Sequence, residues 1–136
     1  MARLTFYDLA NEDIKFLEMA VGGEERNFTS SMAPYIQNIV EKVLKQVVVS
    51  FVVPAKIPED IPETHSLRRL YFFLKDVLPT YKIDRADINM LDGFYLDARY
   101  PGPSAYVVSK EAVEEAYDAL IRIKKYTDKF IKTNSK

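Results

Sequence analysis

The chain has 136 residues, of which 48% are hydrophobic and 29% are charged. This length and composition are typical of a soluble globular protein with one core, so we expect a single domain over residues 1–136. Lys and Arg number 19 against 20 Asp and Glu, which gives a formal net charge of −1. This balance argues against a protein whose whole surface binds nucleic acid, but it leaves room for a local basic patch.

The absence of cysteine excludes disulfides, thiol catalysis and cysteine-ligated metal sites. The single histidine disfavours a zinc site made of protein ligands alone, and we expect no metal and no cofactor. The most apolar stretch, VVVSFVV at residues 47–53, is too short to span a bilayer, and the N-terminus has no apolar segment of signal-peptide length. We therefore expect a cytoplasmic protein.

The first predicted helix begins near Thr5 and ends at Gly22 and Gly23. Thr5 and Asp8 have the spacing of a capping box, and glycine commonly follows the last turn of a helix. The apolar residues of this segment recur at helical intervals: Phe6, Ala10, Ile14, Leu17 and Val21.

The second helix, over Met32 to Phe51, has the strongest pattern in the sequence. Its β-branched tail would also suit a strand, but the helical stripe runs into that tail without a break. Four polar residues lie off the stripe, with an i,i+4 pair among them: Gln37, Glu41, Lys42 and Lys45. The stripe consists of Met32, Tyr35, Ile36, Ile39, Val40, Val43, Leu44, Val47, Val48 and Phe51.

Three more helices follow a proline-marked acidic loop. The third begins near Thr64 and stops before Pro79, with Leu67, Leu70, Tyr71, Leu74, Val77 and Leu78 on one face. The fourth is capped by Asp84 or Asp87 and ends at Arg99 or Tyr100, with a stripe of Ile88, Leu91, Tyr95 and Ala98. Ser109 caps the fifth, which carries Val113, Ala116, Leu120, Ile123 and Thr127, with Ile131 near a frayed end. Single apolar stripes and short loops predict an all-α, up-and-down antiparallel bundle of about five helices.

Positive charge gathers around the start of the third helix. His65 can serve as an acid, a base or an anion contact there, or it is simply part of the first turn. Arg68 and Arg69 oppose the helix macrodipole, so a negative charge should offset them. The upstream residues Glu59, Asp60 and Glu63 are the nearest candidates, and an anionic ligand or partner is the alternative.

The segment LDARYPGP, residues 96–103, is the second candidate for function. Proline at 101 restricts Tyr100 to an extended conformation, and Arg99 suits the end of a helix. Arg99 and Tyr100 either fasten the loop to the bundle or contact a ligand. The sequence shows no catalytic triad, glycine-rich phosphate loop or paired-histidine metal motif. We expect Tyr106, Tyr117 and Tyr126 to pack against the protein, because no basic patch surrounds them.

Four segments in this order resemble the HEPN domain family: QNIVEKVLKQ, THSLRRL, DARYPG and SKEAVEEAYDALIRIKKY. The likeness covers roughly residues 4–131. It implies a bundle of about five helices and a homodimer. For a small prokaryotic member it also implies a minimal nucleotidyltransferase as partner, sometimes as a toxin–antitoxin pair, and nucleotide binding in some members.

A large branch of the same family consists of metal-independent ribonucleases, which use an Arg and a His near the end of the fourth helix, often followed two residues later by a Tyr. In that pattern four to six residues separate the Arg from the His. When Tyr100 is matched to that Tyr, the His position falls on Ala98, and with the four-residue gap the Arg position falls on Gly93. His65 belongs to another element and does not fill the role. The resemblance therefore implies no catalytic residue of the standard kind.

The leading hypothesis from the sequence is a non-catalytic binding module. Arg99, Tyr100, His65 and Arg68 are its candidate contacts to a nucleotide or an acidic partner. The alternatives are a ribonuclease toxin with a divergent site, and a plain dimerisation scaffold without a small ligand.

Overall fold

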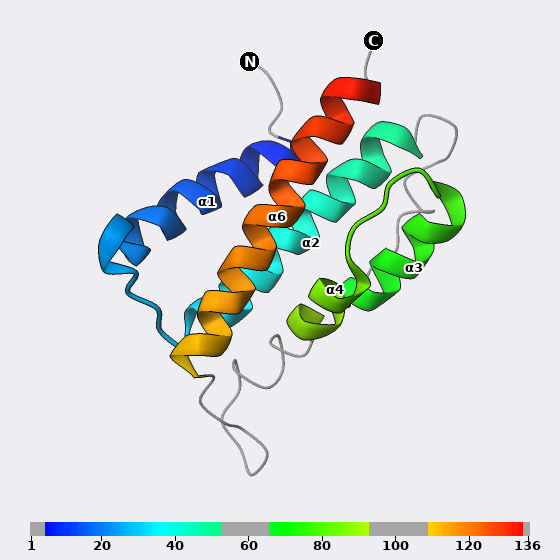
Figure 1. Cartoon of the computed structure of the whole chain (residues 1–136). Coiled ribbons are helices and arrows are strands. Elements are labelled where there is room, and N and C mark those ends of the chain that lie inside the picture. Colours follow the sequence, from blue (N-terminus) through cyan, green and yellow to red (C-terminus); the bar gives the residue numbers. More distant parts are fainter. Residues whose placement is uncertain (1–4, 53–65, 93–108, 135–136) are drawn as a thin grey trace.

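The computed structural model describes residues 5–52, 66–92 and 109–134, and every element in those ranges is helical. The elements are α1 (Phe6–Val21), η1 (Gly23–Glu25), α2 (Met32–Phe51), α3 (Leu67–Val77), α4 (Arg85–Asp92) and α6 (Lys110–Asn134), as Figure 1 shows. The all-α bundle is confirmed. The predicted end of the fourth helix at Arg99 or Tyr100 lies outside the described residues.

The caps of α1 agree with the sequence prediction. The Thr5 hydroxyl accepts a hydrogen bond from the Asp8 backbone N–H at 3.0 Å, and the Asp8 carboxylate accepts one from the Thr5 N–H at 2.9 Å. Gly22 ends the helix in the left-handed region with φ 76°, and its N–H donates to the Glu18 carbonyl. Only glycine adopts this conformation at no steric cost, which explains why the helix stops there.

Helix α2 is the centre of the bundle, in contact with α1, α3, α4 and α6. Its whole predicted stripe is buried or half-buried, and its β-branched tail is helical as expected. Gln37 and Glu41 were predicted to lie off the buried stripe, but they are 1% and 7% exposed. The prediction was wrong for these two residues because four helices surround α2 and cover its polar side as well. Glu41 is nevertheless satisfied by Lys45, 2.9 Å away, so the predicted pair is present.

The starts of the later helices differ in part from the prediction. Helix α3 begins at Leu67 and not near Thr64, because Ser66 is the N-cap and accepts from the Arg69 N–H. Val77 is 40% exposed, so the apolar face of α3 ends at Leu74 and the half-buried Leu78. Asp84 caps α4 through the Ala86 N–H, whereas the alternative cap Asp87 is buried.

Helix α6 confirms its predicted cap and stripe. Ser109 accepts from the Ala112 N–H at 3.1 Å, and the helix continues to Asn134, past the frayed end expected at Ile131. Every predicted stripe residue of this helix is buried: Val113, Ala116, Leu120, Ile123 and Thr127.

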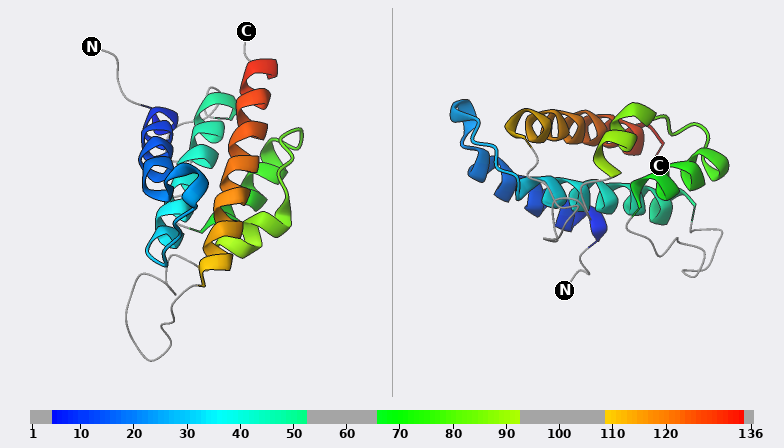
Figure 2. Two further views of the ribbon diagram at one scale, coloured as in Figure 1. Left: turned by 60° about the vertical axis from the view of Figure 1, so that its left-hand side comes forward. Right: turned by 90° about the horizontal axis from the view of Figure 1, so that it is seen from below.

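Helices α2, α3 and α6 run in one direction, and α1 and α4 run in the other (Figures 1 and 2). The Tyr7 N–H at the start of α1 bonds Gln46 near the end of α2, so these two helices are antiparallel. Phe51 at the end of α2 contacts the Phe130 ring near the end of α6, so these two are parallel. The antiparallel arrangement therefore holds for the neighbours α1–α2 and α3–α4.

The segment that joins α3 to α4 is fastened to α6 by an aromatic cluster. The Tyr81 ring lies 5.1 Å from the Phe130 ring and 5.4 Å from the Tyr126 ring. The Tyr81 and Thr127 hydroxyls are hydrogen-bonded at 2.7 Å, and the Lys82 N–H donates to the Tyr126 hydroxyl at 2.7 Å. Tyr126 therefore packs against the protein as predicted, and so does Tyr117, which lies on Phe28.

The Tyr81→Phe variant tests the burial of this hydroxyl. Burial raises the pKa of Tyr81, so above about pH 10 the unfolded chain loses the phenolic proton while the folded chain keeps it. Above this pH the free energy of unfolding therefore falls by up to about 1.4 kcal/mol per pH unit. We expect the wild-type chain to be about 1 kcal/mol more stable than Tyr81→Phe in urea unfolding near pH 8, and to lose that advantage near pH 11. A difference that is the same at both pH values would contradict the assignment.

Candidate functional site

The first turn of α3 lies against Asp92, the last described residue of α4. The Asp92 carboxylate accepts from the Leu67 backbone N–H at 2.6 Å and from the Arg68 N–H at 3.4 Å. The Ser66 hydroxyl donates to the same carboxylate at 3.4 Å. Asp92 thus satisfies N–H groups that have no partner within helix α3. We call the group formed by Ser66, Leu67, Arg68, Asn89 and Asp92 the α3–α4 junction.

The core determines where this junction lies. The side-chain amide of Gln37, buried on α2, donates to the Asp92 backbone carbonyl at 3.4 Å. Leu67, which belongs to the junction, and Leu91, which precedes Asp92 on α4, are fully buried. The junction is therefore a surface feature that rests on α2 and on buried leucine side chains.

Arg68 is the cationic side chain that the junction presents to solvent. Its Nε donates to the Asn89 side-chain oxygen at 3.2 Å, which fixes the direction of an exposed guanidinium. Within the described ranges its two terminal amino groups make no hydrogen bond. A guanidinium held in this way can donate two parallel hydrogen bonds to a phosphate or a carboxylate.

One negative charge near Arg68 and Arg69 comes from Asp92, which the sequence did not indicate as their neighbour. A carboxylate at a helix N-terminus interacts favourably with the macrodipole, and Asp92 occupies this position from another helix. The upstream acids Glu59, Asp60 and Glu63 lie outside the described residues. In the sequence, the signal for an acidic partner was the positive charge of Arg68 and Arg69 in the first turn of α3.

Of the four predicted site residues, the structure describes Arg68. His65, Arg99 and Tyr100 lie outside the described residues, as do Gly93 and Ala98. His65 is bonded to Ser66 and Gly93 to Asp92, and Ser66 and Asp92 are in contact. Along the chain, His65 therefore directly precedes the junction, whereas Arg99 and Tyr100 follow Asp92 by seven and eight residues.

A second ionic contact fixes α4 against α6. Arg122 donates to both oxygens of the buried Asp87 carboxylate, at 2.7 and 3.3 Å. This hydrogen-bonded carboxylate raises the pKa of the Arg122 guanidinium. Sequence reasoning considered Asp87 only as a cap, and nothing local in the sequence indicates a partner 35 residues away.

Metal-binding clusters and membrane-spanning helices were both absent from the residues that the structure describes. Among them, no group of three or more His, Cys, Asp and Glu side chains could hold a metal ion. No helix in the described part is long and apolar enough to cross a membrane.

Comparison with known families supports the resemblance seen in the sequence. The family model of the HEPN domain matches residues 8–130, a span that includes α2, α3 and α4 completely. The chain belongs to the HEPN domain family. No curated protein and no solved structure matches it. In this HEPN domain the α3–α4 junction lies inside the matched span, and the DARYPG segment begins five residues after Asp92 in the sequence.

The Asp92→Ala variant tests the cap. It removes the carboxylate that α3 uses at its N-terminus and leaves two arginines in the first turn uncompensated, so we expect a loss of about 1–2 kcal/mol in urea unfolding. Asp76→Ala is the matched control, because Asp76 is exposed in the last turn of the same helix. Its removal should change stability by no more than about 0.5 kcal/mol. Equal losses in the two variants would show that Asp92 does not cap α3.

Proposed function

We propose that this HEPN domain is a non-catalytic binding module that contacts a nucleotide or an acidic partner surface at the α3–α4 junction. The observation that carries the proposal is the contact between Ser66 of the THSLRRL segment and Asp92, which precedes the DARYPG segment by five residues in the sequence. The proposal extends to a homodimer and to a minimal nucleotidyltransferase as partner, in the manner of a toxin–antitoxin pair. The family resemblance supports these two assignments.

Four residues contact the ligand in this proposal: Arg68, Arg99, Tyr100 and His65. The exposed Arg68 guanidinium binds a phosphate or carboxylate, and Arg99 adds a second positive charge. Tyr100 supplies a stacking face or a hydroxyl to the ligand, and His65, three residues before Arg68 in the sequence, adds a further donor. Within the described ranges Asp92 is engaged with the α3 backbone, so it does not compete for the Arg68 guanidinium.

The sequence supports binding without cleavage. Gly93 and Ala98 occupy the positions that match the Arg and His of the family's ribonucleases. Cleavage of RNA at the ribose 2′-hydroxyl requires a group that removes a proton, and neither glycine nor alanine has one.

Calorimetric titration with ATP tests the binding role. We expect a saturable heat for the wild-type protein and an affinity about tenfold weaker for Arg68→Gln, because a bidentate charged contact to phosphate is lost. Arg99→Gln should have a similar effect. Lys110→Gln is the control of equal charge change, since Lys110 is an exposed residue at the start of α6. Absence of heat, or equal affinities for Arg68→Gln and Lys110→Gln, would contradict nucleotide binding at the junction.

Incubation with RNA separates this proposal from a ribonuclease. We expect single-stranded RNA to remain intact during long incubation with an excess of the protein, as judged by denaturing electrophoresis. Cleavage that disappears in both His65→Ala and Arg99→Ala would instead establish a divergent nuclease site. If RNA stays intact and Tyr100→Ala changes thermal stability without changing any binding, the domain is a scaffold.

A further inference from the structure

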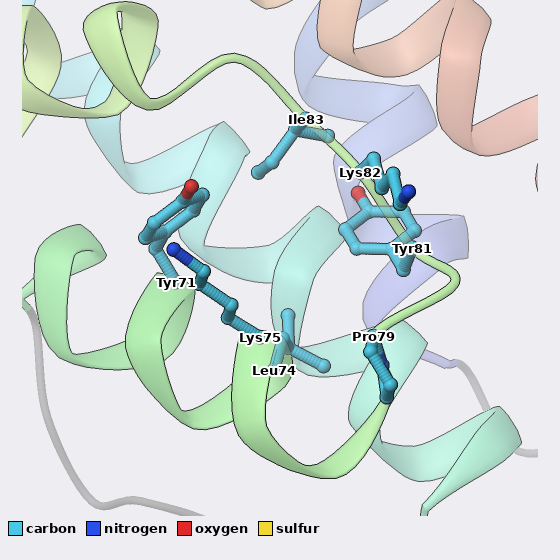
Figure 3. Close-up of a pocket in the computed structure, with 7 residues that line it drawn as sticks. All are labelled: Tyr71, Leu74, Lys75, Pro79, Tyr81, Lys82 and Ile83. Atoms are coloured by element: carbon cyan, nitrogen blue, oxygen red, sulfur yellow. The ribbon is translucent and has the colours of Figure 1, made fainter.

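A cavity of about 470 Å³ lies between α3 and the segment that follows it. Figure 3 shows Tyr71 and Lys75 of α3 on one side and Tyr81 and Lys82 on the other, with Ile83 at one end. This volume is within the range of small-molecule sites. The cavity lies toward the end of α3, whereas the α3–α4 junction lies at its start.

The walls of this cavity are apolar and already fixed. Leu74, Pro79 and Ile83 contribute aliphatic surface, and the half-buried Tyr71 contributes a ring. The Tyr81 hydroxyl is bonded to Thr127, so the 5% of Tyr81 that stays exposed adds part of its ring, and not its polar group, to the cavity wall. Hydrogen bonds from the Tyr81 N–H to Leu78 and from the Lys82 N–H to Tyr126 hold the segment in place. The cavity is therefore preformed, with Tyr71 and Tyr81 in two of its walls.

The charged groups of the cavity are both positive. Lys75 and Lys82 are the charged side chains among the described lining residues, and no acidic side chain is in that set. Within the described part of the chain, neither ammonium group has an ion pair or a side-chain hydrogen bond. Lys75 in the last turn of α3 also interacts favourably with the helix macrodipole, but this explains neither the cavity nor Lys82. The cavity thus disfavours cations and favours an anion with an apolar body.

We propose that this cavity binds a small planar aromatic carboxylate. Its ring system lies between Tyr71 and Tyr81 over Leu74, and its carboxylate pairs with Lys75 in the field of Lys82. This site is separate from the proposed nucleotide contact, and it does not involve Arg68.

Two-dimensional ¹H–¹⁵N NMR of the full chain with 2-naphthoate as the probe tests the site. We expect saturable shift changes for residues 71–83, with a dissociation constant of about 1 mM or lower. The neutral analogue 2-naphthamide has the same ring system and should bind at least about tenfold more weakly, because it lacks the charge that the lysines recognise. Equal binding of the two probes, shift changes centred elsewhere, or no saturation would overturn the proposal.

Lysine variants give the second arm of the experiment. Lys75→Gln and Lys82→Gln should each weaken 2-naphthoate binding by about fivefold, with little effect on folding because both side chains are exposed. Lys110→Gln should bind the probe like the wild-type protein. If Lys75→Gln and Lys110→Gln bind 2-naphthoate equally, the assignment of Lys75 is wrong. A protein that fails to bind ATP but passes this test has the cavity site without the junction site.

Discussion

The burial of α2 on nearly all sides is the constraint on which the rest of the structure depends. Helices α1, α3, α4 and α6 all contact it, and ten of its 20 residues are buried. A helix covered in this way has little room for polar side chains unless each finds a partner. Glu41 finds Lys45 on the same helix, and Gln37 reaches the Asp92 backbone on α4. The contact from Gln37 links the centre of the core to the surface junction.

This link explains why an exposed arginine has a defined position. Gln37 holds the end of the described part of α4, Asp92 caps α3, and Asn89 on α4 then accepts from Arg68. Each contact has ordinary geometry and contributes modestly alone. Together they connect α2, α4 and α3, so a change at Gln37 or Asp92 alters the place where Arg68 meets solvent. The same connection makes the junction a better support for a ligand contact than an isolated surface side chain.

The features that could be predicted from the sequence are those made by residues close in the chain. The Thr5 and Asp8 box, the Ser109 cap and the Glu41–Lys45 pair all join residues three or four positions apart. The contacts that define the site join distant residues: Leu67 to Asp92, Asp87 to Arg122 and Tyr81 to Thr127. These depend on how the helices lie against each other, which no single stripe specifies. The start of α3 illustrates the point, because Thr64 and Ser66 are both good caps and the placement of Asp92 favours Ser66.

The distribution of charge over α3 and α4 reconciles a nearly neutral chain with the anion binding that we propose. Between Ser66 and Asp92 the acidic residues are Asp76, Asp84, Asp87 and Asp92, and two of these are used internally. Asp87 pairs with Arg122 of α6, and Asp92 caps α3. The basic residues of the same stretch all remain exposed: Arg68, Arg69, Lys75, Lys82 and Arg85. A net charge near zero over the whole chain is therefore compatible with a positive outer surface on this pair of helices, because the fold directs part of the negative charge inward. Both proposed sites, at opposite ends of α3, draw on this asymmetry.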